Sequence, residues 1–384
     1  MSSSQAAAPA PAGFRRRLGH VLALGVDNPK AGRIAYLDLA KVLAIYAVVF
    51  NHTGQFGFQH YLAWSPSGLA YWAGLSLSIS CKVAVPLYFM ASGAVLLGRD
   101  EPLRVVWGKR VKRMAIVILV MGLLQYALRK QGFFGAEADY AASPAGVGDF
   151  CRAMLSGGIL NWFLYSYLGF LMLLPLLRAM AQNLKPQHFT YLICLGVGYQ
   201  LLVASLKAWL GWGITNYFSL PLATANFVFY PLLGYWLGEQ VKVKRIQGRL
   251  VGLALAASAL SIAYTAVMTW HDGVTGGDPS TQFYFNSLVA VTTLTCMLTL
   301  AWALQRWPLP RRAAQAVMWL AGGVFGVYLT EGILRNQFLW DLIEAWAPGI
   351  TTLPATLVGV ALIVTGGLIA VNLVRLIPPV RRYI

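Results

Sequence analysis

The sequence predicts an all-α protein that crosses a membrane about ten times, and two observations carry this prediction. The first is composition: of 384 residues, 58% are hydrophobic and 11% are charged, whereas a soluble domain carries about 25% charged residues. The second is that apolar stretches of about 20 residues, enough for one helix across a bilayer, recur along the whole chain. The short alternating segments typical of an outer-membrane β-barrel are absent.

The apolar stretches divide the chain into a membrane domain at 31–376 and two tails. Residues 1–30 begin with an Ala-, Pro- and Ser-rich run followed by arginines, which predicts a disordered, basic tail. Residues 377–384 form a short C-terminal tail. The ten expected spans lie at 36–55, 76–97, 114–129, 158–177, 189–206, 223–240, 250–269, 284–304, 314–334 and 354–374.

The formal charge of +17 indicates membrane topology rather than nucleic-acid binding. Most of the 30 Lys and Arg residues lie in alternate short loops between apolar spans, as the positive-inside rule expects. This asymmetry predicts that both termini are cytoplasmic. The longest outer loop, at about 130–157, would then cover an outward-facing site.

The first span carries three ionisable residues, Asp38, Lys41 and His52. Such groups are costly inside a bilayer and mark a functional site by default. At about 100° per residue, all three share one helix face, with His52 about 16 Å from Lys41 along the axis. We therefore expect an Asp38–Lys41 ion pair and a histidine near the outer end of the helix.

Further polar residues lie within later spans. Lys82 is a second intramembrane cation, or it reaches the outer interface by snorkelling. Pro86 should kink the second span, and Ser92 with Gly93 allows close helix packing. Glu331 lies deep in an apolar stretch and needs a partner or a proton. Lys41 and Lys82 are the expected partners, and pairing alone would be a structural role.

The remaining motifs leave alternatives open. The basic segment after the second span fits a topogenic loop or a site for a polyanionic ligand; its residues are Lys109, Arg110, Lys112 and Arg113. The aromatic residues at the start of the fourth span fit an interfacial belt or a pocket wall; they include Trp162, Tyr165 and Tyr167. The four cysteines and five histidines lack metal-ligand spacing, so no metal site is expected.

The residues favour proton chemistry without naming the reaction. A histidine can take a proton from a hydroxyl, and a neighbouring cation can stabilise an oxyanion, which together suit acyl transfer to an alcohol. A proton-coupled transporter uses the same residue types. There is no GxSxG elbow or Walker-type phosphate loop, and Gly57 stands where an HxxxxD motif would place its aspartate.

Four stretches resemble the acyltransferase 3 family of multi-span bacterial O-acyltransferases. They are YLDLAKVLAIYAVVFNH (36–52), VPLYFMASG (85–93) followed by GKRVKR, NWFLYSYLGFLMLLPLL (161–177), and the pair YPLLGYWLG (230–238) and GVYLTEGIL (326–334). Two positions depart from the family pattern. Lys41 replaces the usual arginine before the histidine and loses its planar fork, and Glu331 stands where a late histidine is common.

The resemblance implies a bacterial inner-membrane enzyme with ten spans and no permanently bound cofactor. Its donor would be acetyl-CoA or another acyl-CoA, and its acceptor a lipid-linked or polymeric glycan at the outer face. It implies His52 as base, Lys41 as the essential cation and the basic segment as a contact for the CoA phosphates. Asp38 and Glu331 complete the expected catalytic set. The expected substrate contacts are Lys82, Ser92, Asn161, Trp162 and Tyr165.

Two other functions fit the same residues. A transporter or flippase of a lipid-linked glycan would share the polar face of the first span but need no acyl-CoA. A non-catalytic assembly subunit would depend on His52 only through folding. The resemblance favours the acyltransferase over both.

Overall fold

The computed structural model describes residues 34–130, 147–156, 162–213, 218–243, 245–277, 285–339, 345 and 352–377. Within these ranges the chain forms helices and turns, without a strand, so the all-α prediction is confirmed. The predicted N-terminal tail, the C-terminal tail beyond Ile377, most of the loop at 130–157 and Asn161 lie outside the described residues.

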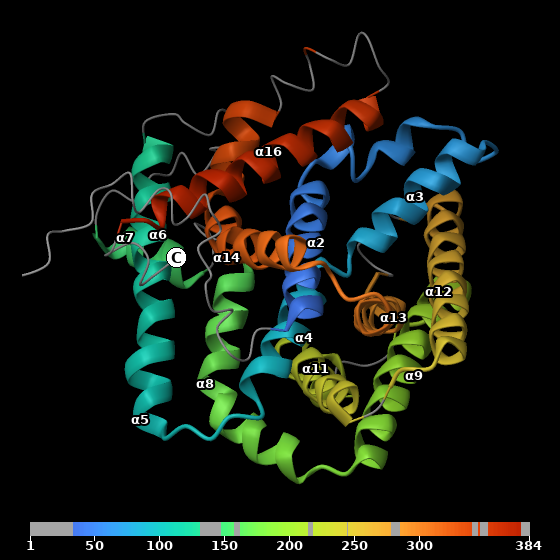
Figure 1. Cartoon of the computed structure of the whole chain (residues 1–384). Coiled ribbons are helices and arrows are strands. Elements are labelled where there is room, and N and C mark those ends of the chain that lie inside the picture. The colour runs from blue at the N-terminus through green and yellow to red at the C-terminus, as the bar shows by residue number, and fades with distance from the viewer. Residues whose placement is uncertain are drawn as a thin grey trace, which may run out of the picture.

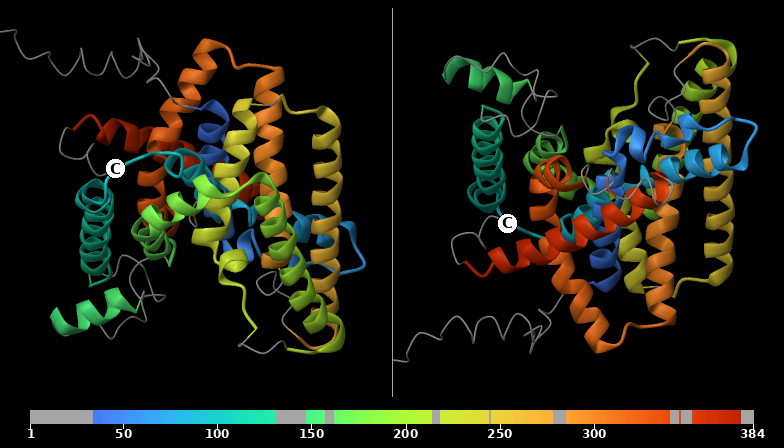
Figure 2. Two further views of the ribbon diagram at one scale, coloured as in Figure 1. Left: turned by 90° about the horizontal axis from the view of Figure 1, so that it is seen from below. Right: turned by 90° about the horizontal axis from the view of Figure 1, so that it is seen from above.

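The long helices form a bundle around a shared apolar core (Figures 1 and 2). In chain order they are α2 (Ala35–Asn51), α3 (Leu69–Cys81), α4 (Ala84–Leu96), α6 (Lys112–Lys130), α7 (Val147–Leu155), α8 (Trp162–Asn183), α9 (Pro186–Leu210), α11 (Asn226–Val243), α12 (Gly248–Val274), α13 (Phe285–Arg306), α14 (Arg311–Leu334) and α16 (Thr352–Val374). The shorter elements are η1 (Gly54–Phe56), η2 (His60–Ala63), α5 (Leu103–Val105), α10 (Pro221–Thr224) and the π-helical turns η3 (Val106–Val111) and η5 (Arg335–Leu339).

Within the described residues, eight stretches are long and apolar enough to cross a membrane, and each coincides with a predicted span. They are Leu69–Leu96, Leu103–Leu128, Trp162–Asn183, Pro186–Leu210, Gly248–Val274, Leu288–Arg306, Arg311–Leu334 and Thr352–Val374. The other two predicted spans are α2, which has only 17 residues, and α11, which carries Glu239 near its end. Both pack against several neighbouring helices, which relaxes the need for an apolar surface.

The second predicted span is broken rather than kinked. Helix α3 ends at Cys81, and α4 begins at Ala84 after Lys82 and Val83. Pro86 is the third residue of α4, where its missing N–H group has no intrahelical acceptor to lose. The proline therefore opens a new helix, and Lys82 lies at the break between two helices.

Helix α2 lies at the centre of the bundle (Figure 1). It packs against α4, α13, α14 and α16, and Ala40, Ala44 and Ile45 on it are fully buried. The outer faces of the peripheral helices instead expose large apolar side chains, such as Leu260, which is 71% exposed, and Leu362. Such faces are expected to contact lipid, so α2 is positioned by protein while the outer helices face the bilayer.

Helices α4 and α11 cross with their backbones in contact. A methyl group built on Gly93 would overlap the backbone of Pro231, and one built on Gly234 would overlap the backbone of Met90. Small residues at membrane helix crossings allow this close approach. The prediction of close packing at Ser92 and Gly93 is confirmed for Gly93, and the crossing fixes α4 beside α2.

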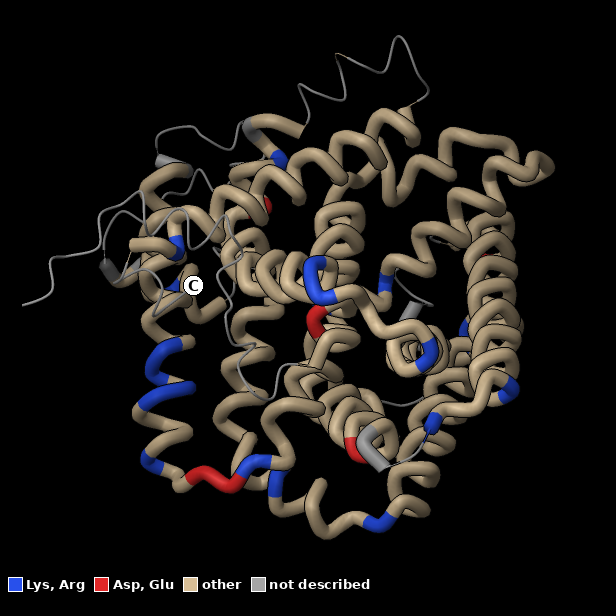
Figure 3. The backbone as a smooth tube through the Cα atoms, in the orientation of Figure 1, with Lys and Arg blue, Asp and Glu red and all other residues tan. Residues whose placement is uncertain are grey.

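A partly buried ion-pair cluster ties the basic loop to α8. Arg110 donates to both carboxylate oxygens of Glu101, through Nε at 2.9 Å and Nη2 at 2.6 Å. Arg178 donates to Glu101 at 2.8 Å and to the carbonyl of Leu96 at 2.9 Å, and it is only 6% exposed. Figure 3 shows charges of both signs where α4 leads into α5. The sequence groups Arg110 with a basic loop, whereas the structure uses Arg110 and Arg178 to hold helices together.

This cluster predicts an acid-sensitive fold. The hydrogen bond from Arg110, assisted by Arg178 and opposed by burial, lowers the pKa of Glu101 from 4.5 to about 2. A lowered folded-state pKa contributes stability above the unfolded value, and this contribution is lost as pH falls from about 4.5 towards 2. We expect the melting temperature of Glu101→Gln to be lower at neutral pH and to vary less across that window. The exposed neighbour offers a control: Asp100→Asn should keep the wild-type pH dependence.

Candidate active site

His52 lies directly after the last residue of α2, and its backbone N–H bonds to the carbonyl of Val49 at 3.1 Å. Its side chain is 38% exposed, in contrast to the buried helix that carries it. The helix thus presents a partly accessible imidazole at the end of the bundle's central element, as the sequence predicted.

The loop after His52 is held in place by hydroxyl groups. Thr53 donates to the carbonyl of Phe50 at 2.6 Å and accepts from the N–H of Phe58 at 3.0 Å. Thr356 of α16 donates to the carbonyl of Phe56 at 2.6 Å, and Ser78 of α3 donates to the carbonyl of Phe58 at 2.5 Å. Because three elements fix this loop, the backbone that orients His52 has little freedom.

Glu331 of α14 faces His52. Its Oε1 lies 3.0 Å from His52 Nδ1, and the carboxylate side chain is only 3% exposed. The two groups are within ion-pair distance, but Nδ1 makes no hydrogen bond of regular geometry, as is common in sites without substrate. A carboxylate at Nδ1 orients an imidazole and leaves Nε2 for a reacting proton.

Arg335 is the cation that the sequence analysis did not assign to the site. Its Nε lies 3.7 Å from Glu331 Oε2, and its side chain is 18% exposed. We expected Lys41 or Lys82 to partner Glu331; the partners seen at the carboxylate are His52 and Arg335. The signal was present, because residues four apart on a helix share a face. Arg335 also begins the π-helical turn η5.

Lys82 lies at the same end of α2 as His52. Asn51 donates to the carbonyl of Cys81 at 3.0 Å, which joins the end of α2 to the break between α3 and α4. The ammonium group of Lys82 lies 4.1 Å from the centre of the Phe58 ring, in the loop that follows His52. A cation–π contact holds the lysine beside the site.

Asp38 and Lys41 form the predicted ion pair, with Lys41 Nζ 3.4 Å from Asp38 Oδ1. Asp38 is buried, while the Lys41 side chain is 31% exposed. The eleven residues between Lys41 and His52 correspond to about 16 Å of helix. Lys41 therefore shares a face with His52 but lies too far along α2 to touch the same reacting atom.

The predicted substrate contacts separate in the structure. Ser92 donates to the Tyr167 hydroxyl at 3.3 Å, within an aromatic group that includes Tyr88, Phe163 and Tyr328. Tyr328 lies one helical turn before Glu331 on α14, so this aromatic group adjoins the His52 site.

Two other predicted contacts face elsewhere. Tyr165 donates to the carbonyl of Met154 at 2.6 Å and so holds α7 against α8. Trp162 is 55% exposed at the start of α8 and packs beside Phe163. Asn161 lies outside the described residues.

The basic segment occupies the π-helical turn η3 and the start of α6, packed against α8. Lys109, Lys112 and Arg113 are exposed and accessible to a ligand. Arg110 differs because its guanidinium group is engaged by Glu101, so it positions the segment. Within the described ranges, no group of three or more His, Cys, Asp and Glu residues could hold a metal ion.

The site thus combines an oriented imidazole, a buried carboxylate, two cations and an aromatic neighbourhood. No curated protein and no solved structure gives a significant match to the chain. The sequence model of an acyltransferase domain matches residues 34–372, nearly the whole chain and all of the helices that build the site. The chain therefore belongs to the acyltransferase 3 family of membrane acyltransferases.

Proposed function

We propose that the protein is an O-acetyltransferase that moves an acyl group from cytoplasmic acetyl-CoA to a hydroxyl of a lipid-linked or polymeric glycan outside the membrane. The observation that supports this best is the contact between His52 Nδ1 and the buried Glu331 carboxylate. That arrangement makes Nε2 a base for a hydroxyl proton. The donor and acceptor classes come from the family resemblance and are part of the proposal.

In the proposed reaction, His52 Nε2 accepts the proton of the acceptor hydroxyl as its oxygen attacks the thioester carbon. The new C–O bond forms, the C–S bond breaks, and the CoA sulfur leaves as a thiolate that takes the proton from the imidazolium. Glu331 stabilises the imidazolium between these steps. Lys82 and Arg335 lie near enough to this end of α2 to stabilise the oxyanion.

The donor would enter from the basic side of the bundle. Lys109, Lys112 and Arg113 are exposed there and suit the CoA phosphates. Lys41 lies between that side and His52 on the shared face of α2. We therefore assign the Asp38–Lys41 pair to the polar arm of the donor rather than to the transferred acyl group.

The proposal is tested with inside-out membrane vesicles and radiolabelled acetyl-CoA. Vesicles that contain the protein and glycan from its native host should transfer label to the lipid-linked or polymeric glycan fraction. Vesicles without the protein should not. If no acyl-CoA labels the glycan while the lipid-linked glycan still crosses the membrane only when the protein is present, the chain is a transporter instead.

Glu331 offers a prediction about orientation. Glu331→Gln keeps the shape of the side chain but removes the charge that stabilises the imidazolium, so we expect the transfer rate to fall by about 10²-fold or more. The variant should change the rate more than the affinity for acetyl-CoA, as single-turnover kinetics can show. Glu239→Gln on α11 is the matched control and should stay near the wild-type rate. An unchanged rate for Glu331→Gln would remove Glu331 from the mechanism.

A further inference from the structure

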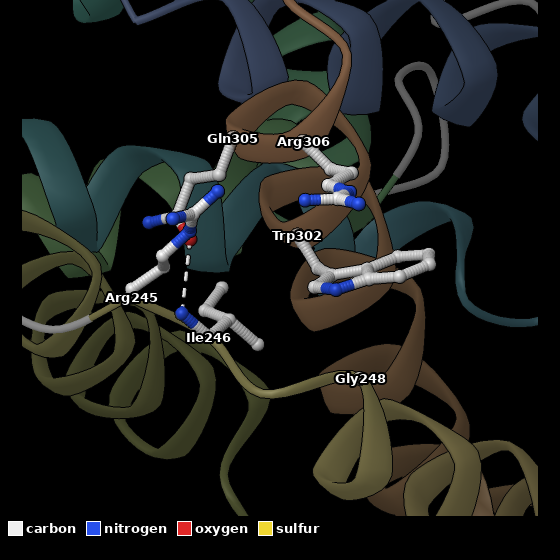
Figure 4. Close-up of a pocket in the computed structure, with 6 residues that line it drawn as sticks. All are labelled: Arg245, Ile246, Gly248, Trp302, Gln305 and Arg306. Carbon is white, nitrogen blue, oxygen red and sulfur yellow. Dashed lines mark hydrogen bonds between the residues drawn. The ribbon is translucent and has the colours of Figure 1, made fainter.

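A cavity of about 280 Å³ lies away from His52, where α11 leads into α12 and α13 ends (Figure 4). Its walls come from the α11–α12 connection and the last turn of α13. The lining residues are Arg245, Ile246, Gly248, Trp302, Gln305 and Arg306. None of them is acidic, and two of the six are arginines.

Gln305 holds the two walls together. Its side chain accepts from the N–H of Ile246 at 3.0 Å and donates to the carbonyl of Val241 at 3.3 Å. These bonds fix the α11–α12 connection against α13, and they place Arg245 and Arg306 at the two sides of the hollow (Figure 4). These hydrogen bonds therefore hold in place the α11–α12 connection and α13, which form the walls of the cavity.

Arg245 and Arg306 each bring a positive charge to this cavity. Within the described ranges, no carboxylate lies at ion-pair distance from Arg245 or Arg306. By contrast, Arg110 and Arg178 share Glu101 at the other basic cluster. Two arginines that face one cavity in this way suit an anion, and the planar guanidinium fork matches phosphate oxygens.

The surroundings indicate where this anion comes from. The cavity lies at the start of one candidate membrane span, Gly248–Val274, and at the end of another, Leu288–Arg306. Trp302 and Trp307 meet edge to face there, with 5.3 Å between ring centres, and tryptophan is typical of the membrane–water boundary. Leu250 and Leu253 on the first turns of α12 are 52% and 62% exposed. An anion with acyl chains would contact both the arginines and these leucines.

The geometry points to a binding site for the phosphate headgroup of an anionic phospholipid, and we propose this as a second ligand site of the protein. Basic pockets at the ends of membrane helices recognise such headgroups. The volume of about 280 Å³ lies below the range of about 300–1,000 Å³ typical of pockets for whole small molecules. It therefore suits a headgroup better than a nucleotide. This proposal does not depend on acyl transfer.

The test measures lipid binding to the purified, delipidated protein by native mass spectrometry. The probes are phosphatidylglycerol, phosphatidylcholine, ADP and inorganic phosphate. We expect phosphatidylglycerol to bind in preference to the other three. Arg245→Gln and Arg306→Gln should each weaken its binding about fivefold, the effect of one basic residue at a membrane surface, and the double variant more strongly.

Arg249→Gln is the matched control, because Arg249 is exposed close to the cavity but does not line it. It should retain binding within about twofold, and the charge-conserving Arg245→Lys/Arg306→Lys variant should recover part of the lost affinity. If the double glutamine variant does not purify as folded protein, the two single variants decide. Wild-type lipid binding by these variants would overturn the proposal. So would binding of ADP or phosphate in place of phosphatidylglycerol, which would assign the cavity to a soluble phosphate compound.

Discussion

Replacing His52 by alanine is expected to lower the rate of glycan acylation by about 10²–10⁴-fold, the contribution typical of a positioned general base. The imidazole is partly exposed, and its Nδ1 lies 3.0 Å from the Glu331 carboxylate. Alanine therefore removes the proposed base from the site. Equal amounts of wild type and variant, reconstituted in vesicles with saturating acetyl-CoA, should differ in initial rate and not in folded yield.

His60→Ala is the matched control, because His60 lies in the same loop region and its Nδ1 is bonded to the carbonyl of Gln55 at 3.0 Å. Its loss should leave the rate within a few-fold of wild type. A His52→Ala enzyme that acylates at the wild-type rate would rule out the proposed base. Equal losses in both variants would instead indicate a shared effect on the loop.

The second large effect is expected at the crossing of α4 and α11. Gly93→Leu should abolish the folded protein, because the new side chain would occupy the backbone of Pro231, which cannot move away as a flexible side chain would. Gly93→Ala and Gly234→Ala should each lower the free energy of unfolding by at least about 1–3 kcal/mol, the range typical of overpacking. Size-exclusion profiles of detergent-solubilised protein and melting temperatures measure both outcomes.

Gly252→Ala on α12 supplies the control for helix propensity, since a methyl group there would meet no atom within 4 Å. Alanine favours a helix over glycine by up to about 1 kcal/mol, so this variant should be as stable as wild type or more stable. If Gly93→Ala behaves in the same way, α4 and α11 do not approach as closely in the membrane as they do here.

The fold could be predicted from the sequence to a large extent because lipid imposes a simple rule. Every predicted span coincides with one helix or, at 76–97, with two, since an apolar stretch of sufficient length has no other way to satisfy its backbone in a bilayer. The exceptions are local. The buried position of Arg178 depends on its hydrogen bonds to Glu101 and to the carbonyl of Leu96 from another part of the chain, and composition does not encode those contacts.

The candidate site shows the same division. Asp38, Lys41 and His52 share one helix, so their common face follows from helical periodicity. The pairing of His52 with Glu331 joins residues almost 280 positions apart, and no periodic pattern links them. Arg110 shows the opposite case. The sequence groups it with its basic neighbours, but in the structure its guanidinium group pairs with Glu101 and not with a ligand. Periodicity places residues on one face of a helix, and packing between helices determines their partners.

The two π-helical turns have a consequence for how this chain tolerates changes in length. One turn carries Lys109 and Arg110, and the other begins with Arg335. A π-helical turn holds about one residue more than an α-helical turn, and such turns occur often at functional sites. Because both kinds of turn complete one full rotation, removing one residue from η3 would restore a regular helix and leave its two flanks close to their present orientation. The same deletion within a regular helix such as α12 would rotate one flank against the other by about 100°. The chain is therefore expected to tolerate a one-residue change of length at η3 better than within its regular helices.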